Sequence, residues 1–384
     1  MAAPTTSFRK KVSTKILQIP GTRPSLHNNQ LLISSGVPSF DSVIGGGIAV
    51  GTAILVEEDT YGSYGKLLLK YFIAEGIVCG HSSFLATADT KPDQIVKELP
   101  SAIVDDPGAV QDAQPSSSEA DDSMKIAWRY QNMSKVQAAP VSTKFGHYFD
   151  LTKVMNPEVL AKTDMRQFYL PDEEIPDRHS NSIMNPAYQK LLQDIKSHII
   201  NKNFSTSSSK QPQQQRNILR IAIHSLGSPL WGEGEVNPDS YDPSLPRFLY
   251  GLRALLRSAF ASCLITVPTY IFNDTAFTRR IENMCDTVVQ LESFVGSERE
   301  TNPVYKDYHG LFHILKIPRL NSLTCHMPDS LDLAFKLRRK KFTIEKLHLP
   351  PELSDTASRP QEDKDVVVKP KTVGCSTGSS KLDF

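Results

Sequence analysis

The chain has 384 residues, of which 39% are hydrophobic, so it is long enough for a large core and typical of a globular protein. The formal net charge is +1, which excludes nucleic-acid binding by overall charge and leaves only a local basic surface. The five cysteines include no C-x-x-C pair, which indicates reduced thiols and no zinc site. We find no signal peptide or membrane span and therefore expect a chain of the cytoplasm and nucleus, with no membrane partner.

Composition along the chain predicts one folded domain interrupted by polar segments. Residues 1–23 are polar and basic, and we expect a disordered tail there. A folded domain is expected over 24–350, with low-complexity insertions near 105–123 and 203–217. The polar stretch at 354–384 is expected to be a second disordered tail.

Short apolar runs alternate with amphipathic segments through the folded part. In chain order, we expect a strand at 52–58, a helix at 66–80, strands at 82–87 and 218–225 around a helix at 185–203, a helix at 245–262 and a strand at 263–267. The runs "DTVVQLESF" and "GLFHILKI" predict an antiparallel hairpin at the edge of the sheet. This alternation favours an α/β fold, with a mainly parallel sheet flanked by helices and antiparallel strands at its edge.

The stretch "EEDTYGSYGKLLLKYF", residues 57–72, follows the first core strand. Ligands of an α/β fold usually bind at the carboxyl ends of its parallel strands, so this position favours a site. Its Gly65-Lys66 matches the end of a phosphate-binding loop, G-x-x-x-x-G-K-[ST]. Thr60 stands where the first glycine belongs, Leu67 replaces the hydroxyl that holds Mg²⁺, and Gly62 lies inside the loop. The loop is therefore degenerate, and Gly62, Gly65 and Lys66 are candidate nucleotide-binding residues.

Neighbouring charges and strand ends favour a site without catalysis. Glu57, Glu58 and Asp59 would repel a triphosphate, although weak nucleotide binding and a plain exposed loop both stay open. The strand at 218–225 ends in His224 and Ser225 instead of the acid that holds the metal in an ATPase. We therefore predict no catalytic residue and no metal site, and we expect His224 to be a structural group.

The run "ISSGVPSFDSVIGGGIAVGTAILVEED", residues 33–59, resembles the beginning of RecA-like ATPase domains of the KaiC and RadA type. Gly36, Asp41, residues 45–47 and Gly51 carry this resemblance. Together with "YFIAEGIVCGH", "LRIAIHSLGSPLWG", "HGLFHILKIPRLNSL" and "FTIEKLHLPPELSD", it makes most of residues 23–355 similar to the family of the fourth subunit of the Elongator complex.

The resemblance implies a RecA-like fold with a degenerate P-loop and an accessory role. Members of that family join the fifth and sixth Elongator subunits in a hetero-hexameric ring, two copies of each. The ring binds tRNA and associates with the catalytic Elongator subcomplex, which modifies the wobble uridine (U34) at C5 through another subunit. The family implies no cofactor for this chain, and ATP at the ring interfaces stays open.

Two other functions compete with this interpretation. A RecA-type ATPase motor acting on nucleic acid would need a hydroxyl at position 67 and an acid at 224 or 225. A factor linked to transcription elongation or histone acetylation would need an acetyl-CoA phosphate loop of its own, and the sequence has none.

A basic run, "FKLRRKKFTIEK", is the main candidate for RNA contact. The five cations within residues 336–341 could neutralise phosphates or face a ring neighbour, and the plain alternative is a solvated or nuclear-localisation-like segment. No aromatic residue is interleaved with them, so we expect recognition by shape and phosphate charge. The RNA-binding or ring-interface candidates are Lys316, Arg319, Lys336, Arg338, Arg339, Lys340 and Lys341.

Overall fold

The computed structural model describes residues 19–25, 30–103, 145–175, 184–207, 216–232, 242–322 and 326–348. The predicted insertion at 105–123 and the predicted tail at 354–384 lie outside these residues. Chain contacts group the described residues up to Leu347 into one compact unit. No helix in the described part of the chain is long and apolar enough to cross a bilayer.

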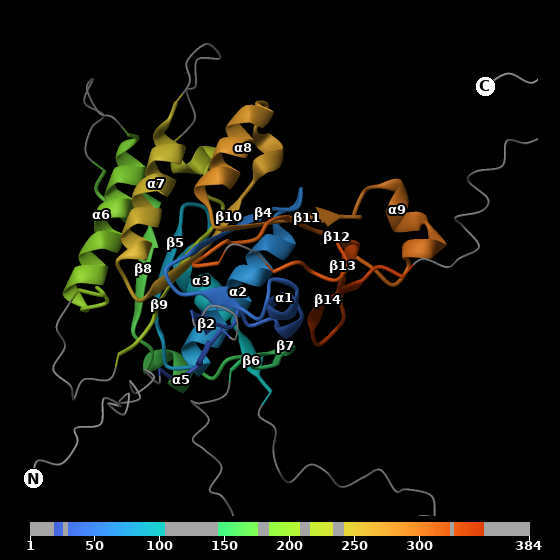
Figure 1. Cartoon of the computed structure of the whole chain (residues 1–384), viewed down its shortest axis with the longest axis horizontal. Helices are drawn as coiled ribbons and strands as arrows, with labels where there is room; N and C mark the ends of the chain where they lie inside the picture. Colours follow the sequence, from blue (N-terminus) through green and yellow to red (C-terminus); the bar gives the residue numbers. More distant parts are fainter. Residues whose placement is uncertain are drawn as a thin grey trace, which may run out of the picture. The chain divides into compact units, whose positions relative to one another are not determined.

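A nine-stranded sheet in the order β14-β13-β12-β11-β4-β10-β9-β5-β8 forms the centre of the fold (Figure 1). The pairs from β8 to β11 are all parallel, and the pairs from β11 to β14 are antiparallel. This confirms the predicted α/β class and agrees with a RecA-like fold. The strands are β4 (Ala53–Glu57), β5 (Ser82–Thr87), β8 (Met165–Tyr169), β9 (Leu219–Ile223), β10 (Ala261–Val267), β11 (Thr287–Ser293), β12 (Gly310–Lys316), β13 (Leu333–Leu337) and β14 (Phe342–Lys346).

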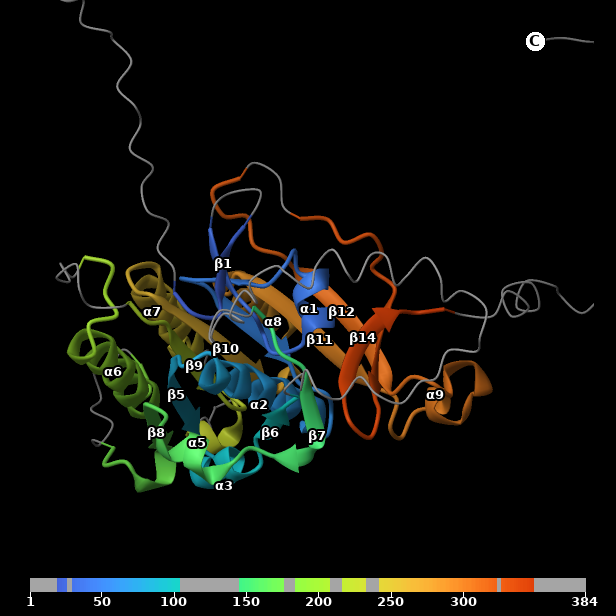
Figure 2. The ribbon, with the colours of Figure 1, turned by 90° about the horizontal axis from the view of Figure 1, so that it is seen from below.

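Helices cover both faces of the sheet because its central strands are apolar on both sides. In β4, Ile54 and Val56 belong to one core cluster, while Ala53 and Leu55 belong to the other. The first cluster includes side chains of α1 (Pro38–Val43), α2 (Ser63–Val78) and α3 (Pro92–Lys97). The second includes side chains of α6 (Pro186–Asn201), α7 (Ser244–Arg257) and α8 (Thr275–Met284), and Figure 2 shows α6 and α7 beside the sheet strands.

Smaller elements complete the described fold. One small sheet contains β1 (Thr22–Pro24), β2 (Leu31–Ile33) and β3 (Ile48–Ala49), and another contains β6 (Pro100–Ala102) and β7 (Phe149–Val154). Short helices are α5 (Pro157–Ala161) and α9 (Glu298–Thr301), with 3-10 turns at Leu170–Asp172, Pro229–Trp231, Thr269–Ile271 and Pro303–Tyr305.

The glycine-rich stretch before β4 has a structural reason for its composition. The carboxylate of Asp41 accepts hydrogen bonds from the Ser34 hydroxyl and the Ser35 amide. Gly36 has φ +88°, and a Cβ there would lie 2.4 Å from the carbonyl oxygen of Tyr71. These residues therefore fix how the chain approaches α2 and the first core strand.

Three expectations need correction. The hairpin of β11 and β12 is not at the edge of the sheet, because β13 and β14 continue it beyond β12. The predicted tail at 1–23 is too long at its end, since Ile19 is buried and β1 begins at Thr22. The predicted insertion at 203–217 begins too early, since Phe204 is buried and accepts a hydrogen bond from the Phe260 amide at 2.8 Å.

Candidate functional site

In the loop between β4 and α2, the carboxylate of Asp59 binds the backbone amides that would hold a phosphate. We call this loop closed for that reason. Asp59 is buried, and its Oδ1 accepts hydrogen bonds from the backbone amides of Tyr64 at 3.0 Å and Gly65 at 3.4 Å. Its Oδ2 accepts from the amide of Ser63 at 3.3 Å and from the Ser63 hydroxyl at 3.2 Å. Amides at a helix N-terminus are the groups that hold phosphate in a working loop. Here Asp59 occupies the position of that anion.

The three candidate nucleotide-binding residues all have structural roles in or beside this loop. Gly62 precedes α2 with φ 65°, in the left-handed region. A Cβ at Gly65 would lie 3.0 Å from Cγ of Glu58, so this glycine allows the buried acid to pack against the helix. Lys66 donates from Nζ to the hydroxyl of Thr90 at 2.9 Å. Its ammonium is therefore directed toward the loop that follows β5.

Two buried glutamates make the surroundings of the loop unfavourable for a nucleotide. Burial raises the pKa of Glu57 to about 7, and the charge of nearby Glu282 adds to the rise. Burial also raises the pKa of Glu58. In their ionised form these carboxylates would repel a triphosphate.

The strand end that would hold the catalytic acid carries a paired histidine instead. His224 follows β9, and its Nδ1 lies 3.0 Å from Oδ1 of Asp89, which follows β5. Burial alone would raise the pKa of Asp89, but the hydrogen bond and charge of His224 hold it well below its usual range. The pair links the ends of two adjacent strands, which is the structural role expected for His224.

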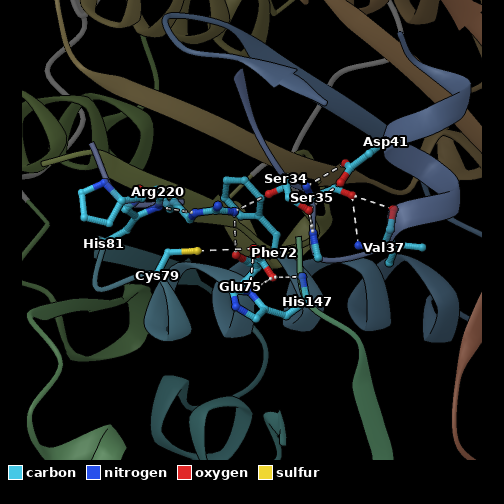
Figure 3. A network of polar contacts seen from close by, with 12 residues as sticks. Ser34, Ser35, Val37, Asp41, Phe72, Glu75, Cys79, His81, His147 and Arg220 are labelled. Carbon is cyan, nitrogen blue, oxygen red and sulfur yellow. Dashed lines mark hydrogen bonds and ion pairs between the residues drawn. The ribbon is translucent and has the colours of Figure 1, made fainter. Parts of the chain in front are cut away.

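A buried polar network lies between α2 and the sheet (Figure 3). Arg220 of β9 is fully buried and donates to Nδ1 of His81 at 3.0 Å and to the Ser34 carbonyl at 2.7 Å. Burial lowers the pKa of His81 to about 3, so the ring is neutral and accepts this bond. The network thereby joins the residue after β2, helix α2 and β9 without reaching the surface.

One part of this network has the donor set of a metal site. Glu75, Cys79 and His147 bring ligand atoms within 4.8 Å of one another. Burial alone would raise the pKa of Glu75, but the hydrogen bond to His147 and the charge of Arg220 lower it. Because burial raises the pKa of the Cys79 thiol and Arg220 already supplies a positive charge, the group fits a hydrogen-bonded cluster better than a cation site.

The basic run forms the hairpin that connects β13 and β14. Residues 338–341 make the turn, which is closed by hydrogen bonds in both directions between the backbones of Arg338 and Lys341. All four turn side chains are exposed. Lys336 differs, since its Nζ pairs with Glu345 at 2.9 Å and lies 4.4 Å from the centre of the Tyr308 ring. We refer to residues 338–341 as the basic turn.

The basic turn lines a groove that also contains aromatic and apolar side chains. The groove has a volume of about 990 Å³ and includes the basic turn, Tyr71, Tyr148 and Phe149. The Leu151 amide of β7 donates to the carbonyl of Lys340 at 2.9 Å, which positions the turn beside Tyr148. Tyr148 is 57% exposed and is distant from the basic turn in sequence, so no local pattern could have identified it.

The remaining two candidates occupy different environments. Lys316 donates from Nζ to the carbonyls of Glu282, Asn283 and Cys285 at 3.3, 3.1 and 2.7 Å. Its charge therefore caps the C-terminal end of α8, and any contact with RNA or a neighbour would have to compete with these bonds. Arg319 is exposed in the segment after β12. The structure thus gathers residues 338–341 and separates them from Lys316.

Fold and site together define a RecA-like domain whose phosphate loop is closed by Asp59 and whose β13–β14 hairpin carries four exposed cations. The family model described as PAXNEB protein matches residues 15–384. Elongator complex protein 4 of Danio rerio is 50% identical, with 99% of this chain and 96% of the relative covered. The Homo sapiens protein of that name is 46% identical over 99% and 92%, and the Saccharomyces cerevisiae protein 25% identical over 86% and 76%. The chain belongs to the PAXNEB family, the family of Elongator complex protein 4.

Proposed function

We propose that this chain is an accessory, non-catalytic subunit of the Elongator complex. The observation that carries the proposal is the hydrogen bonding of Asp59 to the first amides of α2, which fills the place of a phosphate. The names of the relatives at 46–50% identity support membership of Elongator. A chain with a closed phosphate loop contributes to such a complex through its surfaces.

The proposed assembly is a ring with the fifth and sixth Elongator subunits, two copies of each. This ring would bind tRNA and present it to the catalytic subcomplex that modifies the wobble uridine at C5. ATP, if the ring uses it, would be held at interfaces by groups of the neighbouring subunits. We place the protein in the cytoplasm and nucleus, which the free, buried thiols of Cys79, Cys263 and Cys285 support.

The basic turn and Tyr148 are the RNA-binding surface that the geometry supports best. Exposed guanidinium and ammonium groups contact phosphates, and an exposed ring beside them offers a face on which a base can stack. Both requirements meet in one groove of about 990 Å³. Lys336 contributes less, because Glu345 already neutralises it.

The test is tRNA binding by the assembly reconstituted with the fifth and sixth subunits. Replacing all four residues of the basic turn with alanine should weaken binding at least ~10-fold and reduce the salt dependence of the affinity. Tyr148→Ala should weaken binding with little change in the salt dependence, since stacking on an aromatic ring contributes roughly 1–3 kcal/mol per base.

A matched control removes the same charge elsewhere. Lys91, Lys97, Lys162 and Lys196 are exposed cations for which no salt bridge is found in the described part of the chain. Replacing these four with alanine should leave tRNA affinity within about twofold of wild type. Equal losses in both variants would assign binding to diffuse charge and would contradict the proposed surface.

A further inference from the structure

A second pocket lies at the carboxyl ends of β4 and β11, beside the closed phosphate loop. Its volume is about 520 Å³. One wall is the polar face of α8, where Thr275, Thr278, Arg279 and Glu282 recur at helical spacing. The ends of β4 and β11 and the turn at Thr269–Ile271 form the other walls of the pocket.

The pocket is acidic, and part of its acidity is not neutralised. Glu57 and Glu58 are 3% and 6% exposed, and the Oε1 atom of each is buried with no hydrogen-bond partner. Their Oε2 atoms accept from Thr269 at 3.1 Å and Ser225 at 3.3 Å. Buried carboxylate oxygens without a donor are costly, so the site favours a ligand that brings donors.

The other charged groups of the pocket do not supply those donors. Glu292 is already paired with Arg299 at 2.6 Å and His313 at 2.9 Å. Arg279 is exposed, and none of the ion pairs among the described residues joins it to Glu57, Glu58 or Glu282. The unpaired oxygens of Glu57 and Glu58 therefore border a pocket in which Arg279, its cationic lining residue, forms no ion pair with them.

The arrangement distinguishes between kinds of cation. Three ligand atoms close enough to hold a metal ion occur in the described residues only at Glu75, Cys79 and His147, so the pocket acids do not converge on one point. An extended cation with several N–H groups can reach carboxylates that are spread apart. The ring of Tyr270, 52% exposed in the same pocket, offers a face to such a cation.

We propose that this pocket binds a guanidinium or alkylammonium group, which donates hydrogen bonds to Glu57 and Glu58 and lies between Glu282 and the ring of Tyr270. Either a side chain of a partner subunit or a free polyamine would supply this chemistry. The proposal does not depend on tRNA binding, since the pocket and the basic turn have no residue in common.

The electrostatics of the pocket support this assignment. Burial and the charge of Glu282 raise the pKa of Glu57, which shows that a negative charge is disfavoured there without a counter-charge. A bound cation would reverse this effect. Binding should therefore be stronger at pH 8 than at pH 6, because Glu57 ionises between these values.

The first experiment measures thermal unfolding of the full chain with agmatine, which carries a guanidinium and an ammonium group. At constant ionic strength, agmatine should raise the unfolding midpoint by about 2 °C when it is well above its dissociation constant. Glu57→Gln and Glu282→Gln should each abolish the shift, and Tyr270→Leu should reduce it. Glu298→Gln, an exposed acid outside the pocket, is the matched control and should retain it.

A second arm identifies the source of the cation, using spermidine and the complex with the fifth and sixth subunits. If spermidine binds both the free chain and the complex, the natural ligand is a polyamine. If assembly abolishes agmatine and spermidine binding, or if Glu282→Gln weakens assembly about 10-fold, a partner side chain occupies the pocket.

Three results would overturn the proposal. The first is no agmatine effect together with unchanged assembly of Glu282→Gln. The second is an equal agmatine effect in wild type and both glutamine variants. The third is a Mg²⁺ effect that the same variants abolish, since it would make the pocket a metal site. Because Glu282 lies on the partly exposed face of α8, its variant remains informative even if Glu57→Gln is poorly folded.

Discussion

The phosphate loop and the basic turn are both charged connections between regular elements. The charged side chains of the loop are buried, whereas those of the turn are exposed. In the loop, Glu57, Glu58 and Asp59 are all at most 6% exposed, and Asp59 is bound to the amides of α2. In the turn, the four cations at residues 338–341 are exposed, and the bonds that shape the turn come from the backbone.

Buried charges such as that of Asp59 stabilise the fold, whereas the exposed charges of the turn are available to bind a partner. Removing Asp59 leaves backbone amides without acceptors, whereas removing a turn cation leaves every backbone bond in place. Buried, hydrogen-bonded charges should therefore affect stability, and exposed ones should affect binding. Substitutions at Asp59, Glu57 and the basic turn test this contrast, with the largest effect on stability expected at Asp59.

Asp59→Ala should lower the free energy of unfolding by about 2 kcal/mol, because it removes the cap of α2 and leaves its first amides without a partner. Urea unfolding followed by circular dichroism measures this change. Thr60→Ala, at the exposed neighbouring position, is the control and should be nearly neutral. A loss below 0.5 kcal/mol in Asp59→Ala would show that the carboxylate does not hold the helix.

Glu57→Gln should remove a pH dependence of stability. The pKa of Glu57 is about 7 in the fold and 4.5 ordinarily, so its contribution is fully present below pH 4.5 and is lost as the pH rises through 7. The variant should therefore be more stable than wild type at pH 8 by about 1 kcal/mol, a value reduced for solvent screening, and no more stable at pH 4.5.

Unfolding curves at several pH values between 4.5 and 8 would measure this effect. Glu298→Gln, which removes an exposed carboxylate, should follow the wild-type profile. A Glu57→Gln variant that is equally destabilised at every pH would mean that the glutamate is needed for packing and is not strained by its charge.

Alanine at all four positions of the basic turn should change the free energy of unfolding by less than about 0.5 kcal/mol per residue. The bonds between Arg338 and Lys341, and from Leu151 to Lys340, use backbone atoms and survive the substitutions. Thermal unfolding of this variant beside Asp59→Ala gives the direct comparison. A loss similar to that of Asp59→Ala would show that the turn cations are structural.

Patterns of neighbouring residues predicted the centre of the fold well. The strand at 82–87 and the strand within 52–58 occur as expected, because continuous apolar runs are typical of central parallel strands. Helix α2 begins three residues earlier than predicted, at Ser63, because Asp59 caps it. An aspartate shortly before an apolar helix is a recognised start signal, so this feature could have been found from the sequence.

Contacts between distant segments could not be predicted in the same way. The placement of β13 beside β12 depends on pairing across the segment after Lys316, and no local period determines it. Tyr148 joins the basic turn only because β7 bonds to Lys340. Lys316 was expected at an RNA or subunit contact, and only the three-dimensional structure shows that it caps α8.

The measurement that tests the account most directly is ATP binding and hydrolysis by wild type and Lys66→Ala, alone and with the fifth and sixth subunits. A loop closed by Asp59 predicts no ATP binding by the chain alone and the same turnover by both assemblies. ATP binding by the chain that Lys66→Ala abolishes would show that Gly65 and Lys66 hold phosphate, and it would contradict the closed loop.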